Sequence, residues 1–381
     1  MTGRSALAIA GLGCALVLAG CAGRGEGGLS PTPLRAAGAS RVEMLVATTR
    51  APTGAPDMPF AGERGTATAL RRIVVSIPPE ASRHVGDVQW PSSRPVDPAT
   101  SFAVLESRPV DARSATSWFR RTGKHHVLIF VHGFDTRHDE AVFRFAQFVH
   151  DSGTAFVPVL FSWPSRGSVW AYDYDKESTN GSRDALETLL RRAAAEPGVS
   201  EITVLAHSMG SWLAVEALRQ MAIHDGAVTG KIRDVILASP DLDVDVFGHQ
   251  IERIGRGPHF TLLVSRDDHA LDLSRFNAGG VERLGGIDPT AEPYRSMLEK
   301  RGVTVYDLSA LRSSGPLNHG KFTESPDAVR VLGERLLAGQ PISDPHVGFG
   351  DRVGALVIGS VGSATSLMVR PSGLLTDLPR R

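Results

Sequence analysis

A mostly parallel β-sheet with helices on both faces is the fold class that the sequence predicts, because two kinds of pattern alternate after about residue 124. Apolar runs of strand length recur there, and nearly every position in them is apolar, as expected of strands buried on both faces. The segments between them carry apolar residues at the spacing of one helical stripe. We therefore expect one large sheet with strands at residues 127–131, 155–161, 202–206, 235–238, 260–264 and 303–306.

Helices are expected to cover this sheet. The three clearest apolar stripes lie at residues 141–149, 186–193 and 213–221. A last helix is predicted to begin at Ser325-Pro326, because serine is a good N-cap and proline is favoured at the first helical position.

The other segments are arranged around this core, which we place at residues 121–340. Two short β-like runs between clusters of Gly and Pro predict an N-terminal strand extension over residues 41–120. Residues 341–381 form a tail rich in Gly, Ser and Pro, in which an apolar run at 353–361 is a candidate extra strand.

The N-terminus has the pattern of a secretory signal peptide, which we place at residues 1–20. Arg4 precedes an apolar stretch at 6–19 that is too short to span a bilayer. The stretch ends in Leu-Ala-Gly-Cys, which resembles a bacterial lipobox with Cys21 as the residue that is lipidated.

Lipidation of Cys21 would anchor the protein to a membrane of the cell envelope. Residues 21–40, rich in Gly, Ala, Pro and Arg, are then a flexible tether. Ala22 is not the aspartate associated with retention in the inner membrane, so we expect the outer membrane, facing the periplasm, if the source is Gram-negative. Cys14 would leave with the signal peptide, and the mature chain would have no disulfide.

The charge balance argues against nucleic acid as a partner, because 41 Lys and Arg residues are matched by 41 Asp and Glu residues. No dinucleotide-binding G-x-G-x-x-G pattern follows the first core strand, so we expect no cofactor. A metal site is the main rival chemistry, because histidines and aspartates crowd residues 125–139. Their spacing matches no H-E-x-x-H helix, and adjacent strand residues face opposite sides, so we expect no metal.

The strongest catalytic motif surrounds Ser208, in the segment Ala-His-Ser-Met-Gly at residues 206–210. In a nucleophile elbow a strand turns sharply into a helix, and the residues two positions either side of the serine must be small. A predicted strand precedes Ser208 and a helical stripe follows it, so the motif predicts the α/β-hydrolase fold with Ser208 as nucleophile. His207 should point away from Ser208, and we interpret it as structural.

Acyl transfer also requires hydrogen-bond donors aimed at the oxygen that becomes negative. In this fold one donor is the amide after the nucleophile, here Met209. The other comes from the loop after the first core strand, which here reads His-Gly-Phe-Asp at residues 132–135, and we expect the Phe134 amide to be that donor.

The base and the acid follow the nucleophile in the order acid, then histidine. His319, in a glycine-flanked loop between the last core strand and the Ser325 helix, is the predicted base. Three aspartates are candidates for the acid. Asp268 is our choice because it follows the strand before the last, and Asp267 and Asp241 are the alternatives.

Taken together, these motifs resemble a bacterial branch of the α/β-hydrolases catalogued as a domain of unknown function and described as esterase- or lipase-like. The resemblance runs over residues 42–322, with landmarks at 46–50, 130–134, 161–165, 206–210, 238–241 and 268–271. It implies that Asp268 is the acid, because the aspartate of the family's Ser-x-x-Asp-x-Ala-Leu pattern falls there, and it supports His319. It also suggests that Trp163 and residues 172–175 line or support the rim of the site.

The sequence thus predicts a serine hydrolase that cleaves carboxylic esters, with a small-molecule or lipid ester as substrate. An envelope acyltransferase with the same triad is one alternative. A non-catalytic envelope binding protein on the hydrolase scaffold is the other.

Overall fold

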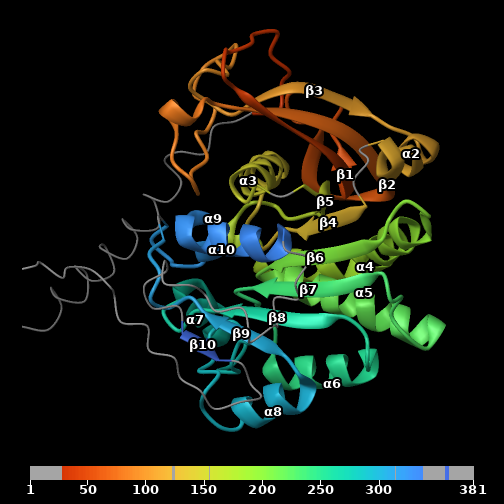
Figure 1. Ribbon diagram of the computed structural model, residues 1–381, viewed down its shortest axis with the longest axis vertical. Helices are drawn as coiled ribbons and strands as arrows, with labels where there is room; N and C mark the ends of the chain where they lie inside the picture. The colour runs from red at the N-terminus through yellow and green to blue at the C-terminus, as the bar shows by residue number, and fades with distance from the viewer. Residues whose placement is uncertain (1–27, 122–124, 154, 314, 338–356, 360–381) are drawn as a thin grey trace, which may run out of the picture.

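One sheet organises the molecule. The computed structural model describes residues 28–121, 125–153, 155–313, 315–337 and 357–359, and within them the strands form a single sheet in the order β10-β9-β8-β7-β6-β4-β5-β1-β2-β3 (Figure 1). The strands are β1 Ser40–Pro52, β2 Phe60–Ile77, β3 Ala103–Pro109, β4 His126–Val131, β5 Val157–Ser162, β6 Glu201–His207, β7 Ile232–Ala238, β8 His259–Val264, β9 Thr304–Asp307 and β10 Val357–Gly359.

The six strands predicted for the core are confirmed as β4 to β9, with ends shifted by at most three residues. They pair in parallel throughout. Strands β4 to β8 are buried almost along their whole length, which is why their sequences are continuous apolar runs.

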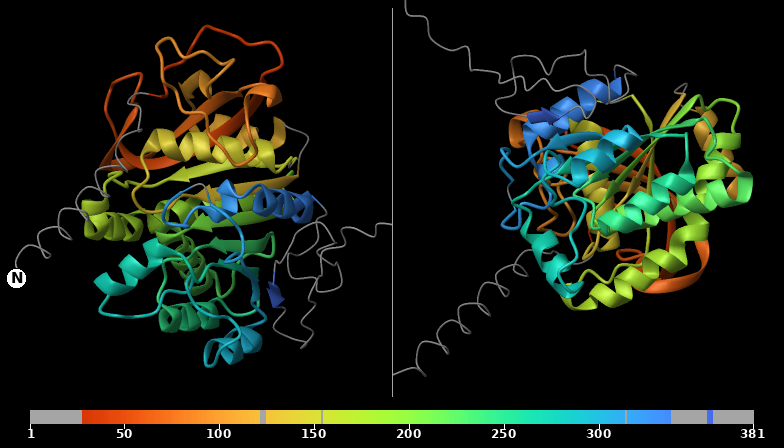
Figure 2. Two further views of the ribbon diagram at one scale, coloured as in Figure 1. Left: turned by 90° about the vertical axis from the view of Figure 1, so that its left-hand side faces the viewer. Right: turned by 90° about the horizontal axis from the view of Figure 1, so that it is seen from below.

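Helices pack on both faces of the sheet (Figures 1 and 2). Apolar side chains of α2, α4, α5, α6 and α8 form the core on one face, and those of α3, α9 and α10 belong to the core on the other. The helices are α2 Ala112–Arg121, α3 His138–Asp151, α4 Tyr172–Ala195, α5 Met209–Asp225, α6 Val244–Ile254, α7 His269–Asn277, α8 Tyr294–Arg301, α9 Lys321–Glu324 and α10 Pro326–Leu337, with 3₁₀ turns η1 Glu80–Ser82 and η2 Val169–Ala171. Helix α10 begins at the predicted proline.

The N-terminal strands continue the same sheet. Strand β1 pairs in parallel with β5, whereas β2 pairs antiparallel with both β1 and β3. This arrangement, a mostly parallel sheet with helices on both faces and an antiparallel N-terminal extension, confirms the predicted α/β-hydrolase fold.

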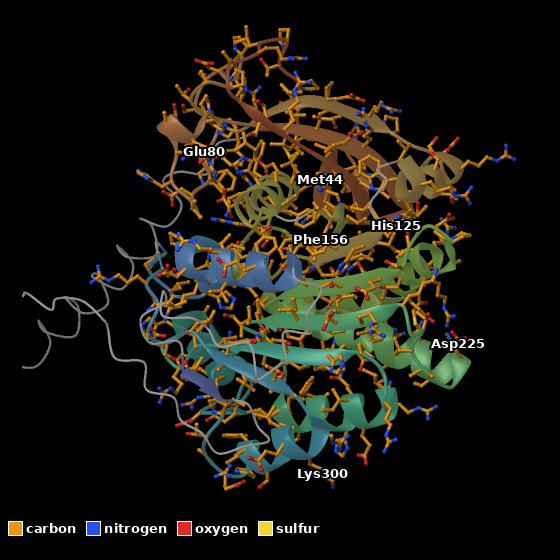
Figure 3. The ribbon with its side chains drawn as sticks, viewed as in Figure 1. Met44, Glu80, His125, Phe156, Asp225 and Lys300 are labelled. Atoms are coloured by element: carbon orange, nitrogen blue, oxygen red, sulfur yellow. The ribbon has the colours of Figure 1, made fainter. Side chains whose placement is uncertain are left out.

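The carboxyl ends of the parallel strands lie along one edge of the sheet, which Figure 3 helps to locate. His125, just before β4, and Asp225, the last residue of α5, lie on the right-hand side of the sheet. Strand β4 starts on this right-hand side and helix α5 ends on it, so the parallel strands end on the left-hand side of Figure 1. Helices α7 and α9 lie on that left-hand side, which faces the viewer in the left view of Figure 2. Ligand sites of open α/β sheets form at this carboxyl edge.

Parts of the chain fall outside the described residues, including the predicted signal peptide, Cys21 and most of the tail at 341–381. In that tail β10 pairs antiparallel with β9, within the run predicted as an extra strand. Among the described residues, no helix combines the length and the apolar character needed to cross a bilayer.

Candidate active site

Ser208 lies at a sharp turn between β6 and α5. Its backbone has φ 52° and ψ −126°, a conformation that non-glycine residues adopt only under strain, and its amide donates to the carbonyl oxygen of Ala238 on β7 at 2.9 Å. Ser208 as a whole residue is 4% exposed. The turn therefore has the geometry of a nucleophile elbow at the carboxyl edge of the sheet.

Two glycines let the elbow contact the loop that follows β4. A Cβ on Gly133 would lie 2.9 Å from Cβ of Ser208, and a Cβ on Gly210 would overlap the carbonyl oxygen of His132. We call residues 132–136 the oxyanion loop, after the role predicted for Phe134. The two glycines place this loop directly against Ser208.

The amides of Phe134 and Met209 both belong to this contact region. Neither donates a hydrogen bond to another residue of the described part of the chain. The Phe134 ring packs edge-on against Tyr172, with ring centroids 5.3 Å apart. Both amides can therefore donate to a substrate oxygen, and stabilisation of an oxyanion requires such donors.

His319 and Asp268 are brought together by loops from different parts of the chain. Nδ1 of His319 lies 2.7 Å from Oδ2 of Asp268, which is 2% exposed. Oδ1 of Asp268 caps helix α7 by accepting from the amides of Ala270 and Leu271, each at 3.1 Å. A carboxylate only accepts, so Nδ1 of His319 donates this bond, and in the neutral form of the ring Nε2 is then the acceptor.

His207 places the His319 loop beside the elbow. Its ring centroid is 4.7 Å from that of His319 and 4.8 Å from that of Phe322, and its Nε2 donates to the carbonyl oxygen of His319 at 3.2 Å. Burial, with a smaller effect from His319, holds the pKa of His207 well below its usual range. The neutral ring next to Ser208 thus supports the histidine loop, as its structural interpretation requires.

The other two candidate aspartates have different partners. Asp267 accepts from Nζ of Lys321 at 2.7 and 2.8 Å and from Nδ2 of Asn318 at 3.0 Å. Burial raises the pKa of Asp267, but the hydrogen bonds from Lys321 and Ser265 outweigh it, so the net pKa is lowered. The carboxylate therefore ties the residues on both sides of His319 to the start of α7, without contacting the imidazole.

Asp241 lies in a separate cluster. It accepts from Oγ of Ser274 at 2.6 Å and from the Tyr172 hydroxyl at 3.1 Å, and Nε of Arg283 is 3.3 Å away. These contacts join α4 to α7. Of the three aspartates, all within described ranges, Asp268 is the one that hydrogen-bonds His319.

The rim residues suggested by the family resemblance support the oxyanion loop. Trp163 is fully buried, its ring stacks on His132 at 4.9 Å, and its Nε1 donates to the His132 carbonyl at 2.7 Å. Burial, aided by the charge of Arg50, lowers the pKa of His132 to about 3, so this ring is neutral. Asp175 is also buried and contacts the same loop.

The histidines that raised the question of a metal site have separate partners. His125 contacts the Gly198 carbonyl, His126 the hydroxyl of Thr203, and His138 Oγ of Ser162. Within the ranges that the structure describes, no group of three or more potential metal ligands is found.

Comparison with known proteins places the chain in a family. The model described as an α/β-hydrolase of unknown function (DUF900) matches residues 111–335 of the 381. An uncharacterized protein of Nostoc sp. (strain PCC 7120) is 28% identical over 133 residues, which are 33% of this chain and 32% of that relative, so the match spans about a third of the relative's length.

Solved structures with similarity to the chain include a hyperthermophilic esterase from the archaeon Pyrobaculum calidifontis, with 12% identity and a TM-score of 0.36, covering 71% of this chain and 82% of that one. A lipase-esterase related protein from Clostridium acetobutylicum ATCC 824 has 14% identity and a TM-score of 0.25, covering 54% of this chain and 82% of that one. The family match extends from α2 to α10 and so includes the elbow, the oxyanion loop and the Asp268–His319 pair. The chain therefore belongs to the family of α/β-hydrolases of unknown function (DUF900).

Proposed function

We propose that this protein hydrolyses carboxylic esters through an acyl-enzyme formed on Ser208. The observation that carries the proposal is the 2.7 Å hydrogen bond between buried Asp268 and His319, on a loop that packs against the elbow. It leaves Nε2 of His319 as the acceptor that a serine nucleophile needs.

In the proposed reaction, Nε2 of His319 takes the hydroxyl proton as Oγ of Ser208 attacks the acyl carbon. The negative oxygen accepts hydrogen bonds from the Phe134 and Met209 amides, and Asp268 stabilises the imidazolium. The imidazolium then protonates the departing alcohol. Water, deprotonated by the same Nε2, cleaves the acyl-serine and releases the acid.

Labelling with a fluorophosphonate probe tests this proposal directly. We expect the purified full-length chain to form one covalent adduct, and Ser208→Ala to form none, because only an activated serine attacks the phosphorus. Ser211→Ala is the matched control, since its buried hydroxyl is already bonded to the Ala206 carbonyl at 3.2 Å, and it should label like the wild type.

A folded wild type that stays unlabelled and cleaves no p-nitrophenyl ester would contradict the proposal and favour the non-catalytic binding protein. Product analysis with added alcohol or lipid acceptors distinguishes hydrolysis from acyl transfer. A dominant transferred product would make the protein an envelope acyltransferase.

We also propose that Cys21 is lipidated and anchors the domain to a membrane of the cell envelope, because the sequence around it resembles a lipobox. Expressed in a bacterial host, the wild type should incorporate labelled palmitate and sediment with membranes. Cys21→Ser should lose both properties, whereas Cys14→Ser should keep them. Equal palmitate incorporation in wild type and Cys21→Ser would rule out this anchor.

A further inference from the structure

We propose that Arg50, at the end of β1, is a positioning residue that holds the oxyanion loop in place for catalysis, together with Ser165 and Asp175. The inference rests on the proposed function and assigns a role to a residue that acts through the oxyanion loop. Arg50 comes from the N-terminal extension, outside the residues that match the family model.

The Arg50 guanidinium holds both ends of the oxyanion loop. Its Nη2 donates to the carbonyl oxygen of Thr136 at 2.7 Å and lies 3.5 Å from Nε2 of His132. Its remaining donors reach the segment after β5 and the start of β2: Oγ of Ser162 at 3.0 Å and the carbonyl oxygens of Ser165 at 2.7 Å and Ala61 at 3.1 Å. The planar fork thus fixes the loop relative to two neighbouring strands.

Asp175 and Ser165 hold the loop through its amides. Oγ of Ser165 donates to Oδ2 of Asp175 at 2.5 Å and accepts from the Thr136 amide at 3.0 Å. The Asp135 amide donates to the same Oδ2 at 3.4 Å. The amides of Asp135 and Thr136 are therefore occupied by Asp175 and Ser165, whereas the Phe134 amide donates to no described residue.

The loop needs such external contacts because its backbone is strained. Asp135 has φ 52°, in the left-handed region that residues other than glycine adopt only occasionally. The contacts from Arg50, Ser165 and Asp175 hold the loop in this conformation.

The burial of Arg50 without a carboxylate partner indicates that its directed hydrogen-bond donors are what this position requires. Arg50 is 1% exposed, and its side-chain hydrogen-bond partners within the described ranges are three carbonyl oxygens, a hydroxyl and a histidine ring, with no carboxylate among them. Burial lowers the pKa of Arg50 to about 10, with Asp175 opposing the shift, so the group stays charged at neutral pH. A buried charge is a poor source of stability compared with an apolar residue of similar size. What an apolar side chain lacks is the set of five directed donors.

Arg50→Met tests this role, because it keeps the length of the side chain and removes every donor. Activity is measured on a p-nitrophenyl ester and normalised to active sites by burst titration. Binding of a trifluoromethyl ketone, which forms an oxyanion adduct on serine, is measured as Ki. We expect kcat to fall about 100-fold with KM within about threefold, and Ki to rise in proportion, because misplacing an oxyanion donor by about 1 Å costs about that much.

Further variants separate positioning from charge and from folding. Arg50→Lys keeps the charge without the fork and should restore less than a third of the loss. Ser165→Ala removes the acceptor of the Thr136 amide with little change in volume, and should raise Ki about tenfold even if Arg50→Met does not fold. Arg83→Met is the matched control: Arg83 is buried but pairs with Asp151 on α3, so its loss should lower stability and leave Ki unchanged.

An unchanged Ki in both Arg50→Met and Ser165→Ala, alongside an active wild type, would overturn the positioning role while leaving the esterase proposal intact. Full recovery in Arg50→Lys would replace positioning with a purely electrostatic effect and would also overturn it. A wild type that neither labels nor hydrolyses esters would instead remove the proposed function, and this inference with it.

Discussion

Replacing Asp268 by asparagine should lower kcat by about 10⁴-fold while the fold is retained. Asparagine is as good an N-cap as aspartate, so its Oδ1 still accepts from the Ala270 and Leu271 amides and α7 keeps its start. Its NH₂ group, however, faces Nδ1 of His319. That nitrogen must then become the acceptor, the proton moves to Nε2, and the imidazole can no longer take a proton from Ser208.

The measurement is kcat on a p-nitrophenyl ester, with thermal unfolding as the check on folding. Asp267→Asn and Asp241→Asn are the matched controls, because both aspartates are hydrogen-bonded away from the imidazole; each should cost less than about tenfold. A loss in Asp267→Asn or Asp241→Asn that equals or exceeds the loss in Asp268→Asn would assign the acid differently.

The elements that the sequence predicts well are those whose pattern depends on burial alone. Strands β4 to β8 are buried on both faces, so their apolar runs are visible without knowledge of any partner. Strand β3 and the first half of β2 escaped prediction because most of their residues are half-buried or exposed and mix Arg, Glu, Thr and Gly into the alternation. Propensity is weak for such strands, and their pairing is what stabilises them.

The residues of the candidate site likewise divide into those with a local sequence signal and those whose role depends on long-range contacts. Ser208 and Asp268 carry local signals, a strand-to-helix turn for one and a capping position after a strand for the other. Arg50 contacts Ser165 and Thr136, which lie 115 and 86 positions away in the sequence. The hydrophobic periodicity of a sequence does not predict contacts over such a separation. The sequence signal for Arg50 is its place at the end of the segment 46–50, and that short pattern alone assigns no role to the residue.

We expect Lys321→Met to lower the free energy of unfolding by about 3 kcal/mol, because Lys321 is a buried cation that holds the loop carrying His319. Lys321 is 1% exposed, and its Nζ donates to both oxygens of Asp267 and, at 3.2 Å each, to the carbonyl oxygens of Leu308 and Ser309. Methionine fills the space but leaves those carbonyls without their donor. The Asp267 side chain is 41% exposed, so water can hydrate it and the loss stays below that of a fully buried unpaired charge.

Urea unfolding measures this effect as a lower midpoint at an unchanged m-value. Activity should fall as well, because Lys321 and Asn318, which flank His319, are both tied to Asp267. Lys231→Met is the control: that lysine donates to the Glu196 carbonyl at 2.8 Å from a half-buried position remote from the site, and its loss should move the midpoint little and kcat not at all. An equal decrease of the urea midpoint in Lys321→Met and Lys231→Met would mean that the Lys321–Asp267 pair does not hold the loop that carries His319.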